Sequence, residues 1–269
     1  MQIKKFLMNG LMGTSAAIFV GARFIPGAEQ NGPVLAAAAT LVAKPALAAT
    51  PATDESESAV AVAVSKLSSL VRPLSHPKAL ETAFRSYFAF KSAHPSDVQK
   101  PYLYFVDYGL ASTQPRGYVF DMSTLSIVDG PFTVAHGRGS ATSQYGVPTR
   151  FSNSSGSAAS SLGLFLAQET YAFSGHSAGS LYNSIGLRLQ GESGSFNSNA
   201  RARGVVAHGA PYVTSSRAGR SEGCPAMEPQ RAQRLLPKLA NGGMVFLFAP
   251  DPKWLASDPW VVASAEEMR

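Results

Sequence analysis

Two hydrophobic patterns follow one another along this chain of 269 residues, and the change falls near Pro101. Before it, apolar residues recur at the three- and four-residue spacing of one helical face, namely Leu80, Ala83, Phe84, Tyr87 and Phe88. Ser75 can cap this helix, Pro77 suits its first turn, and Pro95 stops it. The first pattern therefore predicts a helix that begins after "SHP".

After Pro101, short apolar runs alternate with turn residues, as in successive β-strands. The runs are "YLYFVDYG", "RGYVFDM", "LSIVDG", "PFTVAHG", "SSLGLFLAQETY", "IGLRLQG", "RGVVAHG" and "MVFLFAP", and a Ser/Gly-rich loop, "RFSNSSGSAASSLG", lies among them. One further helix is predicted over 228–243, with Leu235, Leu236 and Leu239 on one face. The chain is therefore predicted to be mainly β, with one or two flanking helices.

Residues 1–48 have the pattern of an export leader. Lys4 and Lys5 precede apolar runs, and Ala46 to Ala48 fits the small-x-small pattern of a signal-peptidase site. We expect export to the periplasm or cell envelope. The alternative is an uncleaved leader, which would then be the contact with the membrane. The rest of the chain is expected to divide into a linker that could hold a short helix, a main domain and a C-terminal tail: 49–75, 76–250 and 251–269.

The charge of the chain narrows the class of partner. The formal net charge is +6, but four basic residues and one acidic residue lie within 1–48, so half of the excess belongs to the expected leader. No run of Lys and Arg interleaved with aromatic residues occurs, which argues against nucleic-acid binding. We expect a monomer without a nucleic-acid partner.

Cys224 is the only cysteine of the sequence, and it lies in a constrained stretch, "GRSEGCPAM". One cysteine cannot form an internal disulfide, and no C-x-x-C pair is present for a structural zinc site. A lone cysteine is most simply a small buried hydrophobic residue. In an exported protein, however, it is also a candidate for a reactive thiol.

Two of the five histidines, His136 and His208, end strand-like runs and precede a glycine. His208 lies 16 positions before Cys224, a length that allows the polar loop between them to bring imidazole and thiol together. A thiol has a pKa of about 8.5 and is a weak nucleophile at neutral pH until a neighbouring base activates it. Gly223 would let backbone N–H groups approach a developing oxyanion. The spacing alone leaves both a Cys/His pair and a structural role open.

The segments "ARARGVVAHGAPYV" and "GRSEGCPAM" resemble the catalytic signature of murein L,D-transpeptidases, in the branch with S-x-G-C-P-A. The resemblance continues in order through "FVDYGLAS", "PRGYVFDM", "VAHGRGS" and "LRLQGE", and it covers roughly Leu80 to Pro250. It implies an L,D-transpeptidase-like β-sandwich with a helix flanking the active site. It also implies Cys224 as nucleophile, His208 as base, Ser221 as the residue that holds the loop, and an oxyanion hole formed by the N–H groups of Gly223 and Cys224.

In the reaction that the resemblance implies, the thiol attacks a peptidoglycan stem peptide at the carbonyl of its third residue. The terminal D-alanine leaves, a thioester forms, and the side-chain amine of a second stem resolves it into a 3→3 cross-link. No metal and no organic cofactor is expected, and the partners are stem peptides that act as donor and acceptor. Two alternatives remain: an L,D-carboxypeptidase, in which water replaces the amine, and a non-catalytic peptidoglycan-binding module.

Substrate contacts are expected from residues near the motif. The donor stem carries carboxylates, so Arg220 and the Arg201/Arg203 pair are candidates to hold one, although each could equally form a structural ion pair. Gly209 and His136 complete the candidate substrate-binding residues.

The chain departs from the better-known branch of the family at two places. Glu222 stands where that branch has a histidine, and a carboxylate that pointed inward would raise the pKa of the thiol. We expect Glu222 to point outward. The segment 174–184, "SGHSAGSLYNS", departs from the family's spacing and is expected to be a loop, either facing the substrate or merely on the surface.

Overall fold

The computed structural model describes residues 54–262, so the expected leader over 1–48 lies outside the described residues. Within the described part of the chain, no helix is both long and apolar enough to cross a membrane.

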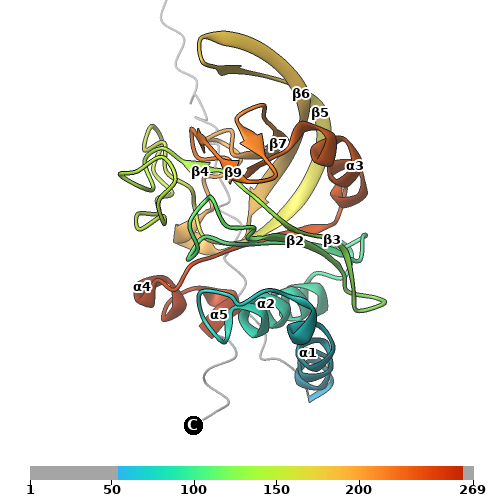
Figure 1. The fold of residues 1–269 in the computed structure, drawn as a ribbon. Coiled ribbons are helices and arrows are strands. Elements are labelled where there is room, and N and C mark those ends of the chain that lie inside the picture. The colour runs from blue at the N-terminus through green and yellow to red at the C-terminus, as the bar shows by residue number, and fades with distance from the viewer. Residues whose placement is uncertain (1–53, 263–269) are drawn as a thin grey trace, which may run out of the picture. The chain divides into compact units, whose positions relative to one another are not determined.

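Eight strands form one hydrogen-bonded sheet. They are β1 (Tyr102–Asp107), β2 (Gly117–Asp121), β3 (Ser126–Phe132), β5 (Gly163–Ser177), β6 (Ser180–Gly191), β7 (Val206–Gly209), β11 (Ala226–Met227) and β12 (Met244–Phe248). Their order is β11-β7-β6-β5-β12-β1-β2-β3, with parallel pairing of β1 with β12 and of β7 with β11. β5 and β6 rise away from the level of β2 and β3, so the strands of the expected sandwich belong to one strongly bent sheet (Figure 1).

Two small pairings complete the strands. β4 (His136–Gly137) pairs in parallel with β10 (Arg220–Ser221), and β8 (Val213–Thr214) pairs with β9 (Arg217–Ala218). The expectation of a mainly β domain with flanking helices is confirmed.

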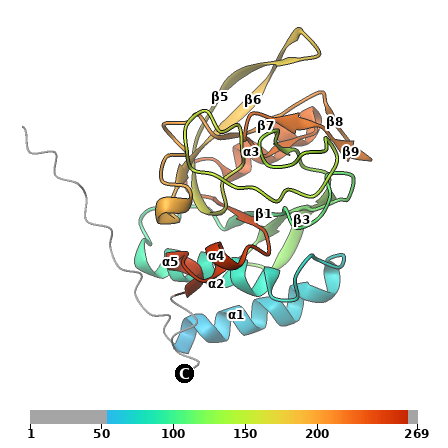
Figure 2. The ribbon, with the colours of Figure 1, turned by 90° about the vertical axis from the view of Figure 1, so that its left-hand side faces the viewer.

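The centre of the sheet follows directly from the sequence. Every residue of β12 and all but the first of β1 are buried. Such continuous apolar runs, without polar alternation, are typical of strands covered on both faces. Helices α1 (Asp54–Leu67), α2 (Ala79–Ala93), α4 (Pro252–Leu255) and α5 (Pro259–Val262) lie on one side of this region, opposite the β5–β6 hairpin (Figure 2). The structure also contains two short 3-10 helices, Ser68–Leu70 and Gly194–Phe196.

The helix expected after "SHP" is α2, but Ser75 does not cap it. The cap position is Lys78, without a side-chain hydrogen bond. Ser75 instead donates its N–H (2.7 Å) and its hydroxyl (2.6 Å) to the carboxylate of Asp107. Asp107 is buried at the end of β1, and a buried carboxylate needs such donors. The expectation for Ser75 was therefore wrong, because its hydroxyl donates to a residue distant in sequence and not to the start of the helix.

Both ends of the described chain pack into the core. The segment expected as a linker contains the 14-residue helix α1, whose Val60, Ala63 and Leu67 are buried. Beyond 250, where a tail was expected, Trp254 and Trp260 are buried and donate their indole N–H groups to Asp258 Oδ2 and Glu192 O, both at 2.7 Å. These residues are therefore structural parts of the domain.

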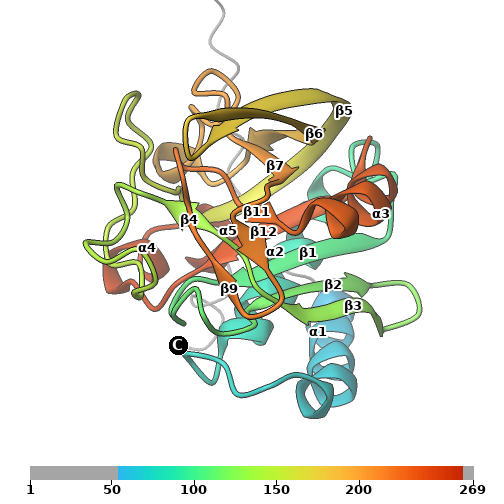
Figure 3. The same cartoon turned by 45° about the horizontal axis from the view of Figure 1, so that its top comes forward.

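The segment 174–184 is not a loop. β5 continues to Ser177 and β6 resumes at Ser180, which leaves Ala178 and Gly179 as a two-residue turn. Both turn residues have positive φ (49° and 80°), the geometry that suits the twist of a tight hairpin. The segment is the tip of a long hairpin, which Figure 3 shows extending over β7.

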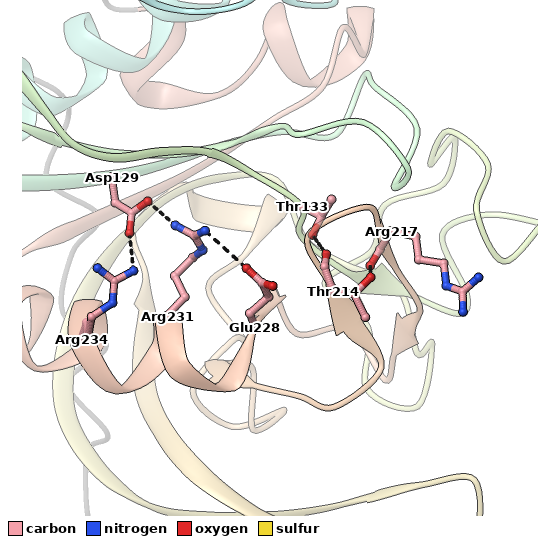
Figure 4. A network of polar contacts seen from close by, with 7 residues as sticks. All are labelled: Asp129, Thr133, Thr214, Arg217, Glu228, Arg231 and Arg234. Carbon is pink, nitrogen blue, oxygen red and sulfur yellow. Dashed lines mark hydrogen bonds and ion pairs between the residues drawn. The ribbon is translucent and has the colours of Figure 1, made fainter.

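Helix α3 (Pro229–Leu239) buries Leu235, Leu236 and Leu239, as predicted. It begins next to the β8–β9 hairpin, and ion pairs tie it to β3 (Figure 4). Asp129 accepts hydrogen bonds from Arg231 and from Arg234 (2.9 Å), and Arg231 also pairs with Glu228 (3.3 Å). This network fixes the helix that directly follows β11.

Candidate active site

The strand pairing places the two backbone segments that carry the predicted chemical groups side by side. β7 ends with His208 and Gly209, and β11 begins two residues after Cys224. His208 lies opposite Ala226 in the parallel register, and its backbone N–H donates to Pro225 O (3.4 Å). The turn that carries Cys224 therefore runs beside the strand that carries His208. β10 and β4 attach the other end of this turn to the rest of the domain.

Ser221 holds the turn from within. Its hydroxyl donates to Cys224 O (2.7 Å) and accepts the N–H of Gly223 (3.1 Å). The N–H of Gly223 is thus already engaged, which differs from the expectation that it would help to form an oxyanion hole. Among the described residues, the N–H of Cys224 has no hydrogen-bond partner, so it remains available as a donor in this turn.

The backbone of the turn requires glycine at position 223. Gly223 has φ of +131°, and a Cβ there would lie 2.9 Å from Ala159 O. The neighbouring Gly137 is as restricted, because a Cβ on it would lie 2.8 Å from the Cα of Gly223. The turn is therefore packed backbone to backbone against β4 and the Ser/Gly-rich loop over 150–163.

We expect Gly223→Ala to reduce turnover by about 10²-fold, because a displacement of about 1 Å is enough for such a loss. Gly194→Ala is the matched control, since Gly194 also has positive φ (+53°) but open space around its Cβ position. Both variants should lose some stability in urea unfolding, and only Gly223→Ala should lose activity beyond that. Equal activity of the two variants would contradict the assignment.

Cys224 is half-buried. Its Sγ lies 3.9 Å from Gly204 O. Burial raises the pKa of the thiol, and Glu222 adds to the rise, while a hydrogen bond from the Val206 backbone and the positive charge of Arg203 lower it. Because the pKa is raised overall, the thiol is protonated at neutral pH.

His208 is buried and held in one tautomer. Its Nδ1 lies 3.0 Å from Gly209 O, and a carbonyl can only accept, so Nδ1 carries the proton and Nε2 has a free lone pair. The ring stacks on Phe173 of β5, with 4.2 Å between centroids. Burial lowers the pKa of His208 to about 4, against the opposing effect of the Gly209 carbonyl. No hydrogen bond within residues 54–262 joins the ring to Sγ of Cys224, so the resting pair is a neutral imidazole and a thiol.

Glu222 points outward, as expected. Its side chain is 72% exposed and pairs with Arg138, whose Nε lies 2.7 Å and 2.9 Å from the two carboxylate oxygens. An exposed pair of this kind contributes little to stability. The pair matters for the thiol instead: the negative charge of Glu222 raises the pKa of Cys224, and the positive charge of Arg138 beside it reduces that effect.

His136, a candidate substrate-binding residue, is fully buried. Its Nδ1 lies 2.9 Å from Nη2 of Arg116, so it accepts a hydrogen bond, and its Nε2 has no partner among the described residues. Burial lowers the pKa of His136 to about 3, and the charges of Arg116 and Arg220 add to this. Arg116 is itself buried and donates to the carbonyls of Leu110 (2.5 Å) and Val134 (2.7 Å). No sequence pattern singles out Arg116, which is an isolated basic residue before an apolar run.

The other candidate substrate-binding residues are already engaged. Arg201 pairs with Glu169 (3.0 Å), and Arg220 donates to Ala141 O (3.4 Å) while half-buried. Gly209 is packed against α3, where a Cβ would lie 2.8 Å from the Cα of Pro229. Arg203 makes four hydrogen bonds, all to uncharged groups.

Four tyrosines that the sequence did not single out lie near enough to Cys224 for a negative charge on its sulfur to raise their pKa. Tyr171 and Tyr182 come from the β5–β6 hairpin, Tyr212 follows β7, and Tyr108 follows β1. Burial raises the pKa of each, so all four are uncharged at neutral pH.

Within the described residues, no group of three or more His, Cys, Asp and Glu side chains could hold a metal ion.

Comparison with known proteins gives the family. Similar solved structures include L,D-transpeptidases from Mycobacterium smegmatis (14% identity, TM-score 0.34, 55% of this chain and 59% of that chain) and Stackebrandtia nassauensis (14%, 0.36, 76% and 95%). The chain spans about three fifths of the first of these. No curated protein matches it. The model of the L,D-transpeptidase catalytic domain matches residues 73–248, and the chain therefore belongs to that family.

Proposed function

We propose that this protein is an exported peptidoglycan L,D-transpeptidase, monomeric and free of cofactors, with Cys224 as nucleophile and His208 as base. The observation that carries the proposal is the tautomer of His208. The Gly209 carbonyl holds the proton on Nδ1 and leaves Nε2 free, on the strand that runs beside the turn of Cys224. Family membership supports the transpeptidase reaction type.

The first half-reaction uses this pair as a general base and a nucleophile. Nε2 of His208 takes the thiol proton as Sγ attacks the carbonyl of the third residue of the donor stem. The N–H of Cys224 faces the charge that develops on the carbonyl oxygen. The C–N bond to the terminal D-alanine then breaks, the leaving amine receives the proton from His208, and a thioester remains on Cys224.

The second half-reaction returns the enzyme to its resting state. The side-chain amine of a second stem attacks the thioester carbonyl and gives up a proton to Nε2 of His208. The C–S bond breaks, the sulfur is reprotonated, and a 3→3 cross-link is released. Because Cys224 is only half-buried, water can also reach the thioester, so hydrolysis to a tripeptide stem is the second candidate outcome.

Mass spectrometry of the products tests the proposal. The purified protein and its Cys224→Ala variant are incubated with muropeptides that carry tetrapeptide stems. We expect the wild type, and not the variant, to form cross-linked dimers through a thioester adduct on Cys224. Trimmed tripeptides alone would assign the carboxypeptidase activity instead. Neither product and no adduct would exclude both reactions and favour a binding module.

A further inference from the structure

Arg203 has a positive charge without a carboxylate partner among residues 54–262. Nη1 donates to Ser152 O (2.7 Å) and Ser161 Oγ (2.6 Å), and Nη2 donates to Ser157 Oγ (3.1 Å) and Ala159 O (2.8 Å). These four bonds use all four Nη hydrogens. The guanidinium therefore has no free edge for bidentate binding of a substrate carboxylate.

All four acceptors belong to the Ser/Gly-rich loop over 150–163, so the loop fixes the orientation of the charge. The same loop touches the turn of Cys224. Ala159 O, which accepts from Arg203, lies 2.9 Å from the Cβ position of Gly223, and Ser160 Oγ donates to Gly223 O (3.1 Å). The loop thus holds the guanidinium and the nucleophile turn in one rigid arrangement.

The guanidinium lies close to that turn. Nη2 of Arg203 is 3.7 Å from the Cβ position of Gly223, the residue directly before Cys224. The carbonyl of Gly204, which follows Arg203 in the chain, is 3.9 Å from Sγ of Cys224. The positive charge of Arg203 favours the ionised form of the neighbouring thiol and lowers the pKa of Cys224.

Among the described residues, Arg203 is the cation whose charge acts on the thiol, because the other ionisable groups near it are either negative or neutral. Glu222 is the nearby anion, and it is paired outward with Arg138. Four tyrosines are uncharged at neutral pH because burial raises the pKa of each: Tyr108, Tyr171, Tyr182 and Tyr212. His208 is neutral above about pH 4.

We propose that Arg203 is a positioning residue that stabilises the developing thiolate of Cys224 with a fixed positive charge, rather than a clamp for the substrate. The proposal rests on the proposed function only in taking Cys224 as the nucleophile. It explains how a thiol whose burial disfavours ionisation can still lose its proton to His208 during attack.

The test is the pH dependence of Cys224 alkylation by iodoacetamide in the full-length protein, where a single cysteine makes the readout specific. We expect Arg203→Met to raise the midpoint by about one pH unit and so to slow alkylation about tenfold at neutral pH. Arg203→Lys should restore most of the difference, because it keeps the charge. Arg201→Met, which loses only the exposed pair with Glu169, should leave the midpoint unchanged. Arg203→Gln replaces Arg203→Met if the latter does not fold.

Two results would overturn the proposal. One is an unchanged midpoint in the neutral variants. The other is an alkylation midpoint that Arg203→Lys raises as far as Arg203→Met does, which would indicate that Arg203 has a purely structural role. In turnover assays, we expect a lower kcat with little change in KM for the donor stem, whereas a raised KM alone would indicate a clamp. A shifted midpoint in a protein that does not cross-link would leave this inference intact and reject the proposed function.

Discussion

Replacing His208 with glutamine is expected to lower turnover by about 10²- to 10⁴-fold, the usual contribution of a general base. Glutamine is similar in size and can keep the contact with Phe173, but it cannot take a proton from the thiol. His176→Gln is the matched control, because His176 is exposed on the β5–β6 hairpin. Turnover of muropeptides, followed by chromatography, measures both. A His208→Gln variant with activity near that of the control would exclude His208 as the base.

The same assignment fixes the acid limb of the wild-type pH profile. His208 must be neutral to accept a proton, and its pKa is lowered to about 4. The rate should therefore fall as the pH drops through about 4, and not through about 6.5, the pKa of an unperturbed imidazole.

Arg116→Met is expected to lower the free energy of unfolding by about 3 kcal/mol. The substitution leaves three acceptors without their donor: Leu110 O, which is partly buried, and the buried Val134 O and Nδ1 of His136. Burial lowers the pKa of Arg116 to about 10, so the side chain is still charged at neutral pH, and relief from burying that charge offsets part of the loss. Urea unfolding measures the difference.

Arg217→Met is the control for Arg116→Met, because Arg217 is exposed on β9 and carries no comparable set of hydrogen bonds. It should change stability by less than about 0.5 kcal/mol. If Arg116→Met is as stable as Arg217→Met, the buried guanidinium does not hold His136 and the two carbonyls as described.

Local pattern was sufficient for most of the fold. The apolar runs located β1, β2, β3 and β12, and the spacing of Leu235, Leu236 and Leu239 located the buried face of α3. The same kind of reasoning, together with the family resemblance, predicted that the strand of His208 lies beside the turn of Cys224 and that Glu222 points outward. The strands and helices depend on the spacing of apolar residues near one another in the sequence. The orientation of Glu222 follows because an unpaired carboxylate is more stable in water than in the protein interior.

The features that the sequence did not predict depend on contacts between distant segments. The hydroxyl of Ser75 suits a helix cap, yet it binds Asp107, 32 positions away. The N–H of Gly223 was expected to face the substrate, yet Ser221 accepts it. Arg116 gave no local signal, because its partners are carbonyls and a buried imidazole that only the folded sheet brings to it. Hydrogen-bond partners of this kind cannot be derived from the spacing of residue types.

The contacts that hold the nucleophile turn also bear on when it forms during folding. Ser160 and Gly223 are 63 positions apart, and Arg138 and Glu222 are 84 apart. Closing loops of this length is entropically unfavourable, so contacts between such distant segments form slowly compared with the local β5–β6 hairpin. The chain would therefore form this hairpin before its thiol is positioned, and alkylation of Cys224 would report a stage of folding later than the hairpin.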